Sequence, residues 1–241
     1  QLDAAVGFGG KKESGFGREG GREGCFDYLK PRAWSKNTLR SAGSASLPDI
    51  SGYEISPIDR TAKLFIGGKQ TRPDATYVTP VISSKGKVLG EVPKGNRKDI
   101  RNAVEAARGA ESWASKTSFN RSQILYYLGE NLSVRAREFA ERLRAMTGVS
   151  AARAAAEVEL SISRLFSYGA WADKYEGAVH LPPIQGVAMA MPEPLGVVGA
   201  LCPPEAPLLG LVSTMAPLMA TGNRIVLVPS EVHPLSATDF Y

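Results

Sequence analysis

The feature that most constrains the fold is an apolar helical segment flanked by two strand-like runs near the end of the sequence. Residues 196–202 read GVVGALC, an apolar run of the kind that a strand buried on both faces requires. Residues 208–220 are apolar over helical length, and a Gly-Asn turn leads into a β-branched run at residues 225–228. A strand, a helix and a strand with short connections predict a βαβ unit with parallel strands. The sequence therefore predicts an α/β fold.

Short strands followed by helices are predicted upstream of this unit. Strand-like segments separated by turn residues predict a small antiparallel sheet. They lie at residues 64–66, 77–79 and 88–92. Apolar residues at helical spacing predict a series of helices. These lie at residues 96–113, from about residue 120 onward, before Gly148 and after Ser150, and a further strand is predicted at residues 187–191.

Aromatic and histidine side chains raise the possibility of two other functions, nucleic-acid binding and metal binding. Aromatic residues at helical spacing could stack on nucleic-acid bases, but such residues more often pack in a core, so core packing is the prediction. They are Trp113, Tyr126, Tyr127, Tyr168 and Trp171. His180 and His233 have no Cys, Asp or second His at ligand spacing, so no metal site is predicted and both are expected in loops.

Composition argues against several classes of partner. The net charge of +5 permits attraction to anions, but Lys and Arg are scattered among Glu, so nucleic-acid binding is not expected. No apolar run approaches the roughly 18 to 20 residues that span a bilayer, so no membrane span is expected. Cys25 and Cys202 are too few for a disulfide framework, which fits a reducing cytosol. With no secretory signal at Gln1, a cytoplasmic location is the default.

The first part of the sequence differs from the rest. Residues 1–24 are rich in Gly and charged residues and contain a formal GxGxxG pattern at Gly15, Gly17 and Gly20. A dinucleotide fingerprint requires a strand before it and a helix after it, and neither flank has a convincing apolar run, so a loop is favoured. Residues 31–58 have little periodicity and predict a linker. The absence of an initiating Met suggests a fragment.

The βαβ unit carries the motifs of a known family. Residues 193–199 read EPLGVVG, and they are followed by Pro203, Pro207, a Gly-Asn pair at residues 222–223 and PSE at residues 229–231. Upstream, LFIGGK at residues 64–69 and the helical segment from Asp99 to Trp113 complete the pattern. Together these motifs resemble aldehyde dehydrogenases over most of residues 60–241. The resemblance implies N-terminal antiparallel strands and helices that lead into the start of a Rossmann-type parallel sheet, here truncated.

The order of the motifs implies a tandem protein. Residues 8–19 look like the near-C-terminal loop of an aldehyde dehydrogenase, yet they precede the motifs of its beginning. We therefore expect residues 1–30 to be the tail of a first copy, residues 31–58 a linker, and residues 59–241 the incomplete cofactor-binding domain of a second copy. This arrangement resembles the aldehyde dehydrogenase 16 family. A circular permutation or a misassembled gene model is the alternative.

The resemblance also implies which chemistry the chain lacks. In this family a cysteine thiolate attacks the aldehyde, a hydride passes to NAD or NADP, and a glutamate activates the deacylating water. The cysteine and the glutamate belong to parts of the family pattern that residues 1–241 do not include. No catalytic residue is therefore assigned, and no activity is expected of this chain alone. Glu205 occupies the place of an asparagine that donates to the oxyanion, although a protonated Glu205 could still donate. Losing one such donor typically lowers turnover about a hundred- to a thousandfold.

Cofactor contacts are expected to be weak or lost in this copy. Val228 replaces a lysine that would bond a ribose hydroxyl, whereas Glu231 keeps the position of the second ribose ligand. Cys202 lies where the family has an apolar residue beside the cofactor, so a packing role is favoured over a nucleophile. The residues that the resemblance places at the NAD or NADP site are Leu201, Cys202, Pro203, Pro204, Val228, Ser230 and Glu231.

Two functions follow from this reading. The first is an NAD(P)-dependent aldehyde dehydrogenase whose chemistry resides in the first copy, with this segment as a structural support. The second is a pseudoenzyme scaffold or partner-binding protein with no dehydrogenase activity in either copy. An unrelated nucleotide-binding module explains fewer residues. The resemblance further implies self-association, or pairing of the two copies within one chain, and leaves room for an unidentified protein partner.

Overall fold

The computed structural model describes residues 62–181, 183 and 185–240. The predicted tail at residues 1–30, the linker at residues 31–58 and the glycine pattern within the tail lie outside the described residues. The described part falls into two compact units. One contains residues 175–195, and the other contains residues 62–174 and 196–240.

The larger unit begins with two β-hairpins. Strand β1 (Leu64–Ile66) pairs antiparallel with β2 (Lys69–Thr71), and β3 (Val78–Ile82) pairs antiparallel with β4 (Val88–Pro93). The three segments predicted as strands are confirmed, but the prediction of one antiparallel sheet is wrong, because each hairpin forms a sheet of its own. A turn between the hairpins redirects the chain: Pro73 accepts a hydrogen bond from Thr76, whose φ is 57°.

The predicted helices are present with one division. Helix α2 (Arg97–Gly109) ends before Ala110, and the short α3 (Glu111–Ala114) follows, so the expected single helix over residues 96–113 is two helices. Next come α4 (Ser118–Val134), α5 (Ala136–Thr147) and α6 (Ala151–Trp171).

The ends of α5 and α6 agree with the sequence. Gly148 terminates α5 with a φ of 74°, which glycine adopts without steric cost. The Ser150 hydroxyl caps α6 by accepting from the Arg153 N–H at 3.3 Å.

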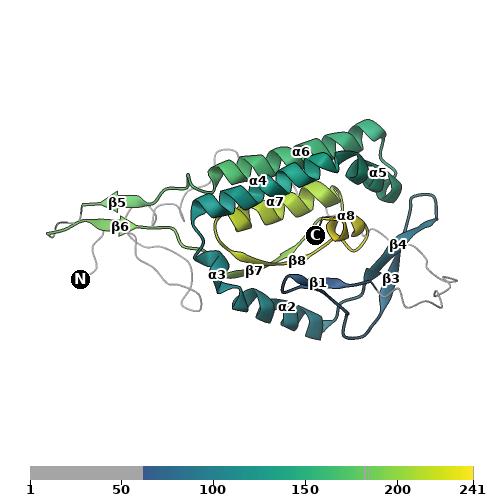
Figure 1. Cartoon of the computed structure of the whole chain (residues 1–241), viewed down its shortest axis with the longest axis horizontal. Coiled ribbons are helices and arrows are strands. Elements are labelled where there is room, and N and C mark those ends of the chain that lie inside the picture. Colours follow the sequence, from purple (N-terminus) through teal and green to yellow (C-terminus); the bar gives the residue numbers. More distant parts are fainter. Residues whose placement is uncertain (1–61, 182, 184, 241) are drawn as a thin grey trace. The chain divides into compact units, whose positions relative to one another are not determined.

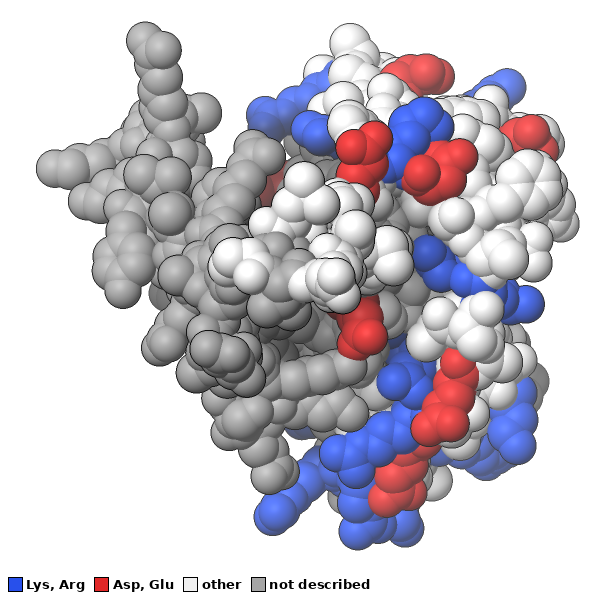
Figure 2. Space-filling view, turned by 90° about the vertical axis from the view of Figure 1, so that its left-hand side faces the viewer, with Lys and Arg blue, Asp and Glu red and all other residues white. Residues whose placement is uncertain are grey.

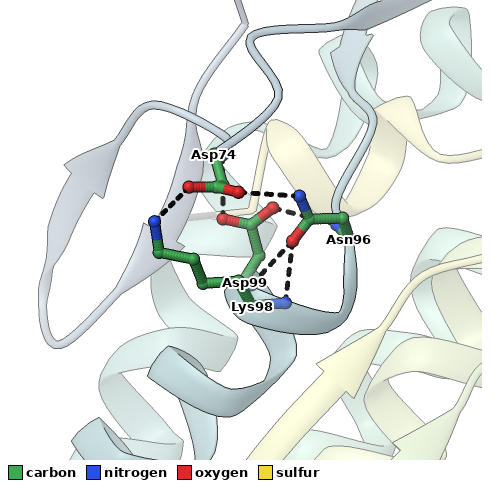
Figure 3. Close-up of polar contacts among 4 residues, drawn as sticks. All are labelled: Asp74, Asn96, Lys98 and Asp99. Atoms are coloured by element: carbon green, nitrogen blue, oxygen red, sulfur yellow. Dashed lines mark hydrogen bonds and ion pairs between the residues drawn. The ribbon is translucent and has the colours of Figure 1, made fainter.

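A polar cluster fixes the beginning of α2 to the turn that follows β2 (Figure 3). The buried Asp99 carboxylate accepts the Asn96 N–H at 2.9 Å and the Asp74 N–H at 3.0 Å. In return the Asn96 side-chain oxygen accepts the N–H groups of Lys98 and Asp99, which completes a capping box. The Asp74 carboxylate accepts hydrogen bonds from the Asn96 side-chain amide and from the Lys98 ammonium.

The predicted βαβ unit is confirmed. Strand β7 (Val197–Leu201), helix α7 (Pro207–Ala220) and strand β8 (Arg224–Val228) follow one another, and the strands are parallel. Figure 1 shows this pair between α7 on one side and α2 on the other. The expectation that β7 is buried on both faces is wrong for this chain, because the Leu201 side chain is 80% exposed.

The core of this unit lies among α4, α5, α6 and α7. Its largest fully buried side chains are aliphatic or aromatic and include Leu125, Phe139, Leu143, Leu165, Leu208 and Val212. The prediction of core packing for the aromatic residues is wrong for Tyr127 and Trp171, which are 63% and 60% exposed. A helix that packs on one side only leaves some aromatics at helical spacing on its outer side. Trp113, Tyr126 and Tyr168 are half-buried.

The smaller unit contains one β-hairpin among its described residues. Strand β5 (Ala178–His180) pairs antiparallel with β6 (Ala188–Ala190). The strand predicted at residues 187–191 is therefore confirmed, whereas β5 was not predicted and the assignment of His180 to a loop is wrong. Val179 and Met189 are opposite each other in the register and are 69% and 70% exposed, so this hairpin presents an apolar face.

The described chain ends near a short helix, α8 (Leu235–Thr238). Arg142 of α5 forms an ion pair of 2.7 Å with the Asp239 carboxylate, and Arg135 donates to the Asp239 carbonyl at 2.7 Å. None of the helices in the described residues combines the length and apolar character needed to cross a membrane.

Candidate functional site

The residues that the sequence placed at the cofactor site converge at one edge of the parallel pair. The register sets Leu201 beside Val228, and the Cys202 N–H donates to the Val228 carbonyl at 2.9 Å. The loops at residues 202–206 and 229–234 therefore leave from adjacent positions at the carboxyl ends of the two strands. This is the edge at which open α/β sheets ordinarily bind their ligands.

His233 makes two hydrogen bonds at this edge, one within the second loop and one to the first loop. The His233 N–H donates to the Ser230 hydroxyl at 3.2 Å, which folds the second loop into a turn. The imidazole Nδ1 lies 3.1 Å from the Pro204 carbonyl oxygen, so the tautomer with a hydrogen on Nδ1 can donate across to the first loop. The loop predicted at His233 is confirmed, whereas no pattern in the sequence signals its contact with Pro204.

The first loop also lies very close to the first turn of α7. A Cβ atom added at Gly210 would lie 2.6 Å from Cγ and 2.8 Å from Cδ of the Pro203 ring. Only a residue without a side chain fits there while the loop keeps its course. Gly210 therefore sets how closely Pro203 approaches the helix.

The charged side chains of the site are acidic. Glu205 and Glu231 are both exposed, one on each loop, while Val228 is half-buried and Ser230 is buried. Neither residues 201–207 nor residues 228–234 contain a Lys or an Arg. A carboxylate can accept hydrogen bonds from ribose hydroxyls, but carboxylates repel phosphate.

Cys202 is a packing residue in this arrangement. Its side chain is buried against Leu211 and Ala237. Burial raises the pKa of the Cys202 thiol, because a thiolate would be poorly solvated there. A thiol held in the neutral form is a poor nucleophile, which agrees with the packing role expected from the sequence.

The N–H groups at the start of α7 already have a partner. The Glu157 carboxylate on α6 accepts the Leu208 N–H at 3.0 Å and the Leu209 N–H at 3.3 Å through the same oxygen. No sequence pattern signals this contact, since 51 positions separate Glu157 from Leu208.

The residues present fit a dinucleotide only in part. Glu231 offers an acceptor for a ribose hydroxyl, but Val228 offers no ammonium, and Glu157 holds the helix N–H groups on which a phosphate would depend. Among the described residues, no group of three or more His, Cys, Asp and Glu is placed to hold a metal ion. On the face drawn in Figure 2, basic and acidic side chains are interleaved rather than gathered into a patch of one sign.

Comparisons with known proteins identify a family. The sequence model described as "Aldehyde dehydrogenase family" matches residues 70–241. The chain is 34% identical over 166 residues to an aldehyde dehydrogenase of Agaricus bisporus, and this alignment covers 67% of this chain and 33% of that protein. It is 33% identical over 186 residues to retinaldehyde dehydrogenase 3 of Mus musculus, and this alignment covers 73% of this chain and 35% of that protein.

Solved structures show the same fold. The betaine aldehyde dehydrogenase of Staphylococcus aureus, solved in complex with NAD+, superposes with a TM-score of 0.72 at 24% identity. The match covers 75% of this chain and 37% of that one. The chain thus spans about a third of the length of the curated relatives that it matches.

Proposed function

Because this chain belongs to the aldehyde dehydrogenase family, we propose that residues 59–241 are the opening part of an aldehyde dehydrogenase copy that supports the protein without performing catalysis. The reaction of the whole protein is the NAD(P)-dependent oxidation of an aldehyde to an acid. A first copy carries that chemistry, and the copy that begins here stabilises and completes the assembly.

The tandem arrangement rests on the order of the motifs. Residues 8–19 resemble the near-C-terminal loop of the family, and they precede the opening segment LFIGGK at residues 64–69. Residues 1–30 are accordingly the tail of the first copy and residues 31–58 the linker, as in the aldehyde dehydrogenase 16 family. The family match runs over residues 70–241, the part assigned here to the second copy.

A single observation carries the proposal of a non-catalytic copy. Val228 ends β8 and Glu205 lies on the loop that follows β7, so both lie at the carboxyl edge of the β7–β8 pair. By resemblance, the family has a lysine and an asparagine at these two positions. Glu205 is exposed beside the site, and a carboxylate there would repel an oxyanion instead of donating to it. Val228 supplies no ammonium for a ribose hydroxyl, so NAD or NADP binds this copy weakly or not at all.

The test reads the coding sequence on both sides of this segment and then measures activity. A Cys after a Gly-Gln pair, with a Glu upstream of it, marks a competent copy. If only the first copy carries them, replacing that Cys with Ala should abolish aldehyde-dependent reduction of NAD or NADP by the full-length protein. Activity that survives this replacement contradicts the proposal, because it must then come from the second copy.

The second candidate function is a pseudoenzyme scaffold without dehydrogenase activity in either copy. The apolar face of the β5–β6 hairpin favours it, because exposed apolar patches commonly mark interaction surfaces. Under either function we propose that the protein self-associates or that its two copies pair within the chain. If the coding sequence of the first copy lacks the catalytic Cys and Glu, the scaffold function is favoured over the dehydrogenase function.

A further inference from the structure

Helix α7 begins without an acceptor of its own. Ala206 at the N-cap position has no side-chain oxygen, and Pro207 in the first turn has no N–H. The first N–H groups that need a partner outside the helix are those of Leu208 and Leu209. Both donate to one oxygen of Glu157, at 3.0 Å and 3.3 Å.

This helix end is where a βαβ unit ordinarily binds phosphate. The N-terminus of a helix that follows a parallel strand points its free N–H groups and its positive dipole end toward the ligand edge of the sheet. In dinucleotide-binding folds the pyrophosphate lies at this position. Here a carboxylate from α6 carries the negative charge and accepts the hydrogen bonds instead.

We propose that Glu157 is a specificity-determining residue that closes the N-terminus of α7 to the phosphate groups of ligands. Its carboxylate accepts both N–H groups and so occupies the helix end. A nucleotide at this edge must therefore hold its phosphates elsewhere, and Glu205 and Glu231 add repulsion from the two loops. The inference rests on the proposed function only in naming a dinucleotide as the ligand concerned.

Chemical rescue on the 241-residue chain tests this assignment. Glu157→Ala removes the carboxylate and leaves two N–H groups without an acceptor, so Tm should fall by about 2 to 8 °C. Formate should restore at least half of that loss, because a small carboxylate fits the vacated space, and sodium chloride at equal ionic strength should not. Glu157→Gln keeps an acceptor oxygen and should respond to formate no more than the wild-type protein. Glu159→Ala, at an exposed position on the same helix, is the matched control.

Pyrophosphate provides a second measurement that does not depend on the alanine variant. It should raise the Tm of the wild-type protein no more than sodium chloride of equal ionic strength. A larger rise, or a folded Glu157→Ala variant without a specific formate response, overturns the assignment of Glu157. Tight binding of NAD+ by the wild-type protein would contradict the proposed function instead. The formate experiment would still test the assignment of Glu157, because it does not depend on NAD+.

Discussion

Val228 is the single side chain at the sheet edge whose replacement most directly tests the cofactor site. Val228 is the register partner of Leu201, and by resemblance its position corresponds to a lysine of the family. Val228→Lys should strengthen NAD+ binding about tenfold or more, because a hydrogen bond to a charged group contributes roughly 1.5–3 kcal/mol. Isothermal titration calorimetry measures the change. Val228→Met is the control for the longer stem, and an equal gain in both variants contradicts the electrostatic explanation.

Gly210 tests the packing of the first loop against α7. In Gly210→Ala the new methyl group would lie 2.6 Å from the Pro203 ring, so the loop must shift. Overpacking of this kind costs about 1–3 kcal/mol, and the better helix propensity of alanine offsets about 1 kcal/mol of that. A net loss in the free energy of unfolding is therefore expected in urea denaturation. Gly199→Ala, which meets open space, should not lose stability.

Both helices that cover the β7–β8 pair have charged groups at their ends that compensate the helix dipole. Acidic groups lie at their beginnings: Asp99 at α2 and Glu157 at α7. Arginines lie at their ends: Arg224 donates to the Arg108 carbonyl of α2 at 3.0 Å, and Arg121 donates to the Ala220 carbonyl of α7 at 2.9 Å. Each charge also satisfies a backbone group that the helix itself leaves unpaired.

The cluster at the start of α2 predicts a pH dependence of stability. The hydrogen bond from Lys98, followed by that from Asn96, lowers the pKa of Asp74 below its ordinary 3.8. The stabilisation is therefore present above the unfolded-state pKa and is lost as pH falls through the folded-state pKa. Asp74→Asn should reduce the loss of urea resistance between about pH 6 and about pH 3. Glu159→Gln, at an exposed position, should show the wild-type loss.

The predictability of these elements depends on how local their causes are. The βαβ unit and the end of α5 at Gly148 follow from apolar runs and turn residues, which act over a few positions. The short strand β5 has too few residues to show a period. Glu157 lies 51 positions before Leu208, and Arg121 lies 99 positions before Ala220. No local sequence pattern can therefore indicate these two helix caps. At the site, the convergence of the two loops followed from parallel pairing, whereas the contact between His233 and Pro204 did not.

Substitutions on the apolar face of the β5–β6 hairpin test the proposed self-association. Val179 and Met189 form a cross-strand pair that is largely exposed, and burying such side chains contributes about 1.5–3 kcal/mol each. The double variant Val179→Thr with Met189→Thr keeps strand propensity but removes apolar surface, so association should weaken at least about tenfold. Sedimentation equilibrium measures this. Tyr127→Thr, at an exposed position on α4, should leave association unchanged.

The capping of α7 by two earlier helices has a consequence for synthesis on the ribosome. Arg121 and Glu157 precede their partners in the chain, so both capping groups are already present when α7 emerges. Helices α4 and α6 can pair before either parallel strand exists, because their contacts lie entirely within residues 118–171. The nascent chain thus presents a preformed acceptor and a preformed donor to the helix that links the two strands. Parallel pairing, which requires that helix to cross over, can follow on a surface that is already built.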